Sequence, residues 1–237
     1  SLVEPDADLH HFEPRPQDIK NLLEADLVIV NGLGFEPWLD RVNPTTKKAP
    51  LWVVASDGVT PLPFAHHDHA DHNASEGEAV DPHAWQDVKN ARLYAKNIAT
   101  ALMNNDPTHR ALYLENLARY DRDLERLDQE IRNAIEAIPS SKRKIVTSHD
   151  AFGYFEKAYG LQMIAPLGVG REAQPSAKDM AQVIRQIRND AIPAIFLETA
   201  IDTRLAEQLA SETGVKIGGT LYADTLSQKN GPAGTYI

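Results

Sequence analysis

The sequence predicts an α/β protein with two lobes, each a mostly parallel sheet flanked by helices, joined by one long linking helix. Short continuous apolar runs, Leu-Val-Ile-Val at 27–30 and Leu-Trp-Val-Val at 51–54, are typical of buried parallel strands. Helical patterns alternate with such runs, and the alternation resumes after residue 140. Between the two alternating regions lies one amphipathic helical pattern that is much longer than the others.

The first lobe is expected to cover residues 1–105. Ile19, Leu22 and Leu23 share one face of a short helix, and Asn31-Gly32 closes the apolar run that follows it. The pattern predicts helices over 18–26 and 87–104 and strands over 27–30 and 51–54.

The linking helix is expected within residues 106–139. Its apolar residues recur at spacings of three and four: Tyr113, Leu117, Tyr120, Leu124, Leu127, Ile131, Ile135 and Ile138. A helix over about 108–138 would be on the order of 45 Å long, enough to run along a two-lobed molecule. The alternative is a coiled-coil dimer helix, which needs strict heptads over more turns.

The second lobe is expected to cover residues 140–237. Ser176 is a candidate helix N-cap because Asp179 follows three residues later. The pattern predicts strands over 144–147, 163–165, 194–197 and 215–217, with helices over 151–159, 176–189 and 203–213.

Composition limits the function. The net charge of -10 argues against a nucleic-acid partner, because phosphate binding needs a basic surface. No apolar run approaches the roughly 20 residues of a membrane-spanning helix. The chain has no cysteine, so a transition-metal site must use histidine and carboxylate ligands.

Four residues are candidate metal ligands, because each lies in a loop or near the carboxyl end of an expected strand: His10, His83, His149 and Asp224. Ligands of open α/β sheets collect beyond these strand ends, so two facing lobes would place the four side chains across one cleft. Imidazole and carboxylate suit Zn²⁺, with Mn²⁺, Fe²⁺ or Cu²⁺ as alternatives. Taken singly, each such histidine is more often a surface residue than a ligand.

Five motifs in order make the chain resemble the metal-specific solute-binding proteins of zinc and manganese ABC transporters. They are Asp-Leu-His-His-Phe-Glu-Pro at 8–14, Asp-Pro-His-Ala-Trp at 81–85, Ser-His-Asp-Ala-Phe-Gly-Tyr-Phe at 148–155, Glu-Ala-Gln-Pro-Ser at 172–176 and Leu-Tyr-Ala-Asp-Thr-Leu at 221–226. The first departs from the family pattern, with Leu9 in place of proline and Phe12 in place of tyrosine. Family members also normally have another strand and helix before this motif.

The resemblance implies that His10, His83, His149 and Asp224 hold one ion in the cleft between the lobes. His11 is the alternative to His10. It further implies a monomeric receptor, not an enzyme, that delivers metal to an ABC permease. We expect a periplasmic or lipid-anchored extracytoplasmic location, with any signal peptide outside this sequence.

Zinc is the expected cargo, with manganese or iron as the alternative. Family members selective for manganese often have glutamate where this chain has His149, whereas Asp224 favours manganese in part. A His-rich loop at 65–80, with His66, His67, His69 and His72, favours zinc if it samples metal; otherwise it is a solvated loop. A zinc hydrolase and an adhesin are further alternatives. The chain has no His-Glu-x-x-His motif, which argues against the hydrolase.

Acidic residues near the candidate ligands are expected to orient the imidazole rings. The candidates are Glu13, Asp150 and Glu198, because metal-bound histidine usually donates its second ring N–H to such a group. Glu13 and Asp150 are equally compatible with helix capping or a surface position.

Overall fold

The computed structural model describes residues 2–3, 5, 9, 12–41, 50–63, 80–165, 176–199 and 201–237. The chain divides into two compact units, one of Ser1–Leu2 with His11–Asp128 and the other of Val3–His10 with Gln129–Ile237. Within the described ranges, no helix is long and apolar enough to cross a membrane.

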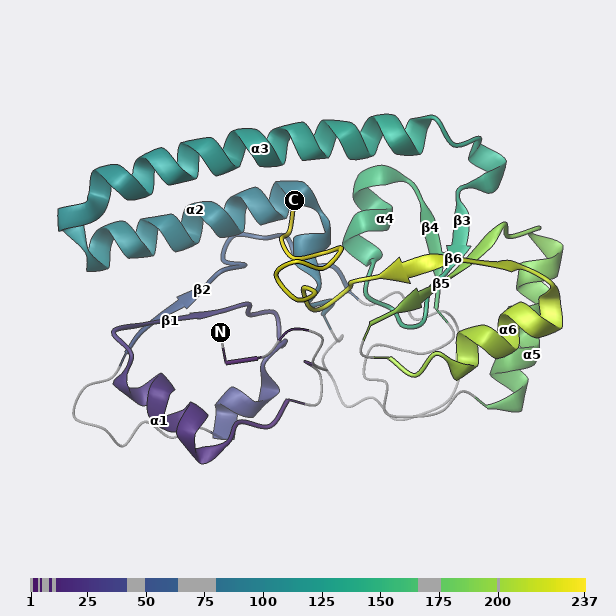
Figure 1. Ribbon diagram of the computed structural model, residues 1–237, viewed down its shortest axis with the longest axis horizontal. Coiled ribbons are helices and arrows are strands. Elements are labelled where there is room, and N and C mark those ends of the chain that lie inside the picture. Colours follow the sequence, from purple (N-terminus) through teal and green to yellow (C-terminus); the bar gives the residue numbers. More distant parts are fainter. Residues whose placement is uncertain are drawn as a thin grey trace. The chain divides into compact units, whose positions relative to one another are not determined.

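In its described residues, the first unit contains a parallel two-stranded sheet, three α-helical segments and three short 3-10 helices. Its strands pair in register from Leu27 with Leu51 to Val30 with Val54. The elements are α1 (Pro16–Glu24), β1 (Leu27–Val30), β2 (Leu51–Val54), α2 (Val88–Asn105) and the first part of α3 (Arg110–Glu136), with short 3-10 helices at Pro37–Arg41, Ala84–Gln86 and Pro107–His109 (Figure 1).

The loop after β1, residues 31–36, has a fixed backbone. Gly32 has a φ of +85°, and a Cβ there would lie 2.5 Å from Val54 Cγ1 and 2.7 Å from Ser56 Oγ, so only glycine fits. The Glu36 carboxylate accepts hydrogen bonds from the backbone N–H groups of Asn31 (2.6 Å) and Gly32 (3.1 Å). Backbone and side chain together hold this loop against the end of β2.

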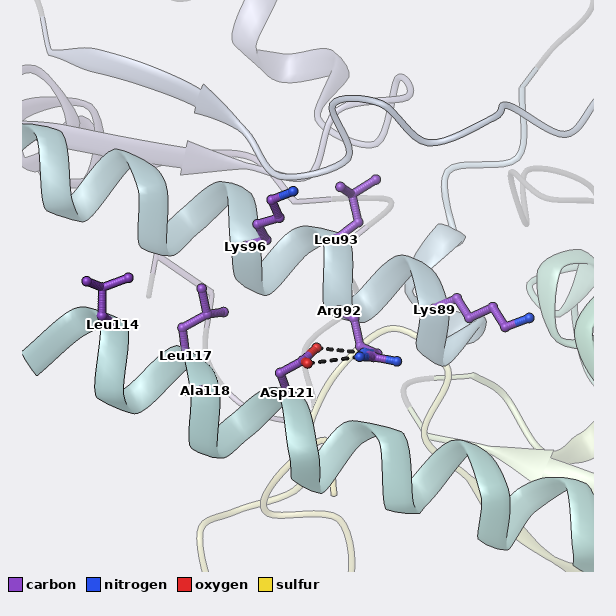
Figure 2. Close-up of a pocket in the computed structure, with 8 residues that line it drawn as sticks. All are labelled: Lys89, Arg92, Leu93, Lys96, Leu114, Leu117, Ala118 and Asp121. Carbon is purple, nitrogen blue, oxygen red and sulfur yellow. Dashed lines mark hydrogen bonds and ion pairs between the residues drawn. The ribbon is translucent and has the colours of Figure 1, made fainter.

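Helices α2 and α3 are joined by an ion pair in which Arg92 Nε and Nη2 donate to the Asp121 carboxylate at 2.6 and 2.8 Å. The hydrogen bonds of this pair raise the pKa of Arg92 and lower the pKa of Asp121. Figure 2 shows the pair at a shallow cavity of about 540 Å³ lined by Lys89, Arg92, Leu93 and Lys96 of α2 and Leu114, Leu117, Ala118 and Asp121 of α3. None of the predicted metal ligands lines it.

The second unit is built on a four-stranded parallel sheet in the order β4-β3-β5-β6. Its elements are β3 (Lys144–Val146), α4 (Gly153–Tyr159), β4 (Gln162–Ile164), α5 (Ala177–Asn189), β5 (Ala194–Glu198), α6 (Arg204–Thr213) and β6 (Lys216–Leu221), with a 3-10 helix at Ser140–Lys142. Two parallel sheets with helices confirm the predicted α/β fold.

Each face of the four-stranded sheet has its own apolar cluster. The larger cluster joins the sheet to α5 and α6 and includes Val146, Ile164, Met180, Val183, Ile187, Ile195 and Leu209. The smaller one gathers Ala151, Phe152 and Ala223, with Met163 packed against it. Met163 and Ile164 face different clusters because successive side chains of a strand alternate between faces.

The strand order changes direction between β3 and β5, which makes a topological switch point at the carboxyl ends of these strands. The chain moves from β3 outward to β4 and then returns to the other side of β3 to form β5. Helices that follow neighbouring strands at such a switch point diverge, and ligands of open α/β sheets bind there. Residues just after β3 and at the end of β5 therefore lie where ligands of such sheets bind.

Helix α3 is a single helix of 27 residues, as its long amphipathic pattern predicted, and it contributes residues to both units. In the second unit, Arg132 donates to the Ala158 carbonyl at 2.9 Å and lies over the Tyr159 ring, 4.9 Å from its centroid. These contacts attach α3 to the end of α4. The division into lobes at 105 and 140 stays a prediction.

Candidate metal centre

His149 lies at the switch point of the second unit, three residues beyond the end of β3. Its side chain is fully buried, with Nδ1 2.6 Å from Glu198 Oε2 and Nε2 3.4 Å from Asp224 Oδ2. Glu198 is the last residue of β5, and Asp224 follows β6 by three residues. The ends of three neighbouring strands thus bring two carboxylates to one imidazole.

Glu198 holds both the ring and the backbone of this segment. Its Oε1 accepts the backbone N–H groups of Ser148 (2.5 Å) and His149 (3.1 Å), while its Oε2 faces the ring Nδ1. A carboxylate at Nδ1 favours the tautomer with the proton on that nitrogen, which leaves the Nε2 lone pair for a metal. The predicted orienting role of Glu198 agrees with this geometry.

The two carboxylates also determine the charge of the imidazole. Burial lowers the pKa of His149, but hydrogen bonding and charge from Asp224 and Glu198 outweigh burial and raise it to about 9. Without a metal the ring is therefore a cation near neutral pH, and both of its nitrogens carry protons. A metal that binds Nε2 must displace one proton.

The metal-free protein should lose stability as the pH rises from about 6.5 to about 9. In this window the folded ring keeps a proton that the unfolded ring, with its ordinary pKa, has lost. The free energy of unfolding should then fall by about 1.4 kcal/mol per pH unit, with the full stabilisation present only below pH 6.5. Urea unfolding at several pH values measures the slope, and His149→Gln should flatten it. An equal slope in that variant would contradict the assignment.

His83 lies in the first unit, immediately before the 3-10 helix Ala84–Gln86 that leads into α2. Its side chain is fully buried, and its Nδ1 is 2.7 Å from Asp81 Oδ1. The same oxygen accepts the backbone N–H of His83 at 2.9 Å. Phe35 and Trp85 pack edge-on against the ring, with centroids 6.1 and 5.3 Å away.

The two units therefore hold their buried histidines in the same way, by a histidine–carboxylate pair. In each, one buried carboxylate contacts Nδ1 of a buried histidine and accepts the backbone N–H of that same histidine. In each, a carboxylate that holds Nδ1 makes Nε2 the nitrogen through which the ring would bind a metal. The role of Asp81 was not predicted, although its position two residues before His83 in an Asp-Pro-His motif was the available signal.

Several predicted residues fall outside the described ranges: His10, His11, the loop histidines His66, His67, His69 and His72, and residues 172–175. Their assignments stay predictions, as does the ligand role of His83, His149 and Asp224. His109, the last residue of the 3-10 helix Pro107–His109, is exposed, with Nδ1 2.7 Å from Asp106 Oδ2.

Buried histidines held by carboxylates in parallel α/β units are typical of a protein that binds a metal ion. The chain belongs to the family described as zinc-uptake complex component A, periplasmic, whose profile matches residues 1–237. The predicted family is thereby confirmed.

Characterised relatives differ in their metal. The iron-binding protein YfeA of Yersinia pestis is 35% identical over 237 residues, which is 100% of this chain and 74% of the relative. The manganese ABC transporter substrate-binding lipoprotein PsaA of Streptococcus pneumoniae is 30% identical over 242 residues, with 100% and 76% covered.

Solved structures share the fold. The periplasmic zinc-binding protein TroA of Treponema pallidum matches with a TM-score of 0.86 at 30% identity, covering 99% of this chain and 84% of that one. A manganese-bound periplasmic metal-binding protein from Candidatus Liberibacter asiaticus matches with a TM-score of 0.84 at 30% identity, covering 99% of this chain and 84% of that one.

Membership of this family makes the protein the extracytoplasmic, metal-binding component of an ABC importer. It is a solute-binding protein and not an enzyme, so the zinc hydrolase alternative is set aside. Its ligand is a divalent metal ion. Since relatives are named for iron, manganese and zinc, the choice of metal rests on the donor atoms of this chain.

Proposed function

We propose that the protein is a zinc receptor in which His83, His149 and Asp224, together with His10, hold one Zn²⁺. The observation that carries the proposal is the histidine–carboxylate pair that occurs in each unit. In both pairs the carboxylate holds Nδ1 of a buried histidine and so orients Nε2 for metal binding. The motifs around all four residues resemble those of the family, with two departures, at Leu9 and Phe12, in the motif that contains His10. The receptor acts as a monomer and delivers zinc to an ABC permease.

The donor atoms favour zinc. Three imidazole nitrogens and one carboxylate oxygen form a borderline set that suits Zn²⁺, whereas Mn²⁺ prefers a site richer in carboxylate oxygen. Four protein ligands around zinc leave no position for an activated water, which suits a carrier. The His-rich loop at 65–80 would collect metal and pass it to this site.

Manganese and iron are the competing cargoes. Asp224 supplies one hard oxygen, and relatives named for iron and manganese match this chain over its whole length. The alternative keeps the same residues and changes only the metal.

A competition titration decides between the cargoes. Metal-free protein, loaded with an equal mixture of Zn²⁺ and Mn²⁺ and then desalted, should retain zinc with less than about one tenth as much manganese, in line with the order of affinities for nitrogen donors. Elemental analysis measures the ratio, and His83→Ala should retain little of either metal. Displacement of zinc by manganese at equal concentration would replace the zinc assignment with the manganese one.

A further inference from the structure

We infer that Asn31, in the loop after β1, is a positioning residue that fixes the metal ligand His83 before metal arrives. The inference rests on the proposed function, since it takes His83 as a ligand. Asn31 is not itself a proposed ligand and acts through the segment that carries His83.

The side chain of Asn31 joins three parts of the first unit. Its Nδ2 donates to the Pro82 carbonyl at 3.0 Å and to the Gly32 carbonyl at 2.9 Å. Its Oδ1 accepts the Tyr94 hydroxyl of α2 at 2.9 Å. The Pro82 carbonyl belongs to the peptide bond that leads into His83, so the bond acts directly on the backbone of the ligand.

Asn31 is itself well anchored. The Glu36 carboxylate holds the backbone N–H groups of Asn31 and Gly32, and the left-handed backbone at Gly32 fits no larger residue. The same loop supplies Phe35, whose ring packs against His83 and lies 5.0 Å from the ring of Trp85. One fixed loop therefore contacts both the peptide before His83 and the imidazole.

The result is a ligand held on both sides. The Asp81 carboxylate fixes the backbone N–H and Nδ1 of His83, while Asn31 fixes the carbonyl that precedes it. Ordering of this segment is completed when the protein folds, so metal binding does not have to supply it. Loss of the Asn31 bonds should therefore weaken metal binding mainly by faster release.

Asn31→Asp tests the inference. The variant keeps an acceptor for Tyr94 but loses both donated bonds, and its carboxylate faces the Pro82 carbonyl. Metal affinity should fall about tenfold, the lower end of the range for residues that support a ligand. Tyr94→Phe removes only the hydroxyl that orients Asn31 and should speed metal release about threefold, within the range for one neutral hydrogen bond.

Asn97→Asp is the matched control. Asn97 of α2 also donates two bonds from Nδ2, both 2.9 Å, but to the carbonyls of Ala55 and Asp57 after β2. This variant should lose thermal stability as Asn31→Asp does, yet keep zinc affinity within about twofold of the unmodified protein, since it leaves residues 81–83 untouched.

Zinc dissociation into a chelator and the melting temperature are measured for all variants. Equal release rates in Asn31→Asp and Asn97→Asp would overturn the inference, and if Asn31→Asp does not fold, an unchanged rate in Tyr94→Phe overturns it. Unaltered zinc binding in His83→Ala would instead show that the proposed function is wrong. The two failures are thus distinguishable.

Discussion

Replacing His149 with alanine should lower zinc affinity by roughly a hundredfold or more. Structural zinc sites with four ligands have apparent binding free energies of about 10–16 kcal/mol, so one ligand contributes about 3 kcal/mol. About 1.4 kcal/mol corresponds to a tenfold change in the dissociation constant. The imidazole of His149 is buried between Glu198 and Asp224, so no solvent-exposed group can replace it easily. Competition against a chromophoric chelator measures the loss.

His109→Ala is the control for this experiment. His109 also contacts an acidic side chain, Asp106 at 2.7 Å, but it is 60% exposed and lies outside the candidate site. Its loss should leave zinc affinity unchanged. Retention of zinc by His149→Ala to within a few-fold of the unmodified protein would remove His149 from the ligand set.

Glu198→Gln should weaken zinc binding by about 10–100-fold although no proposed ligand is changed. Glutamine keeps the shape of the side chain but not its charge. Glu198 uses one oxygen for the backbone N–H groups of Ser148 and His149 and the other for the imidazole Nδ1. Glutamine has only one acceptor oxygen, so it cannot keep both sets of contacts. The pKa of His149 should fall in the variant because one of the two groups that raise it becomes neutral. Isothermal titration calorimetry and NMR titration of the ring measure the two effects.

Glu207→Gln provides the same substitution at an exposed position in the same unit. Glu207 Oε1 accepts the Thr203 hydroxyl at 2.8 Å on the surface of α6. Neither zinc affinity nor the pKa of His149 should respond to this change. Parallel behaviour of the two variants would mean that Glu198 has no specific part in holding the imidazole.

The strands that carry no glycine were predicted with the correct bounds or nearly so. Continuous apolar runs at 27–30 and 51–54 match the bounds of β1 and β2. The burial that such runs predict is wrong for β2, whose Leu51, Trp52 and Val54 are 47%, 38% and 43% exposed. The last strand was predicted to stop at 217 but continues to Leu221 through Gly218 and Gly219. A Cβ on Gly218 would lie 2.7 Å from the Phe196 ring, beside a β-bulge at Ile195/Phe196. Gly218 therefore makes room for the Phe196 ring and does not end the strand. The local sequence does not distinguish a glycine with this role from one that ends a strand.

The candidate site was predictable where a residue follows a strand directly. His149, Glu198 and Asp224 all stand at or just after strand ends, and parallel strands bring such residues together. The contacts of Asn31 with Pro82 and of Phe35 with His83 were not predicted. These residues are about fifty positions apart, and a single sequence carries no signal that pairs them.

The buried carboxylates beside His149 make loading an exchange of ions. In the proposed site, a divalent cation that binds His149 replaces one proton of a cationic imidazole, so the net charge rises by one unit and not two. The charge that distinguishes the loaded protein from the empty one is therefore half of the charge of the ion itself.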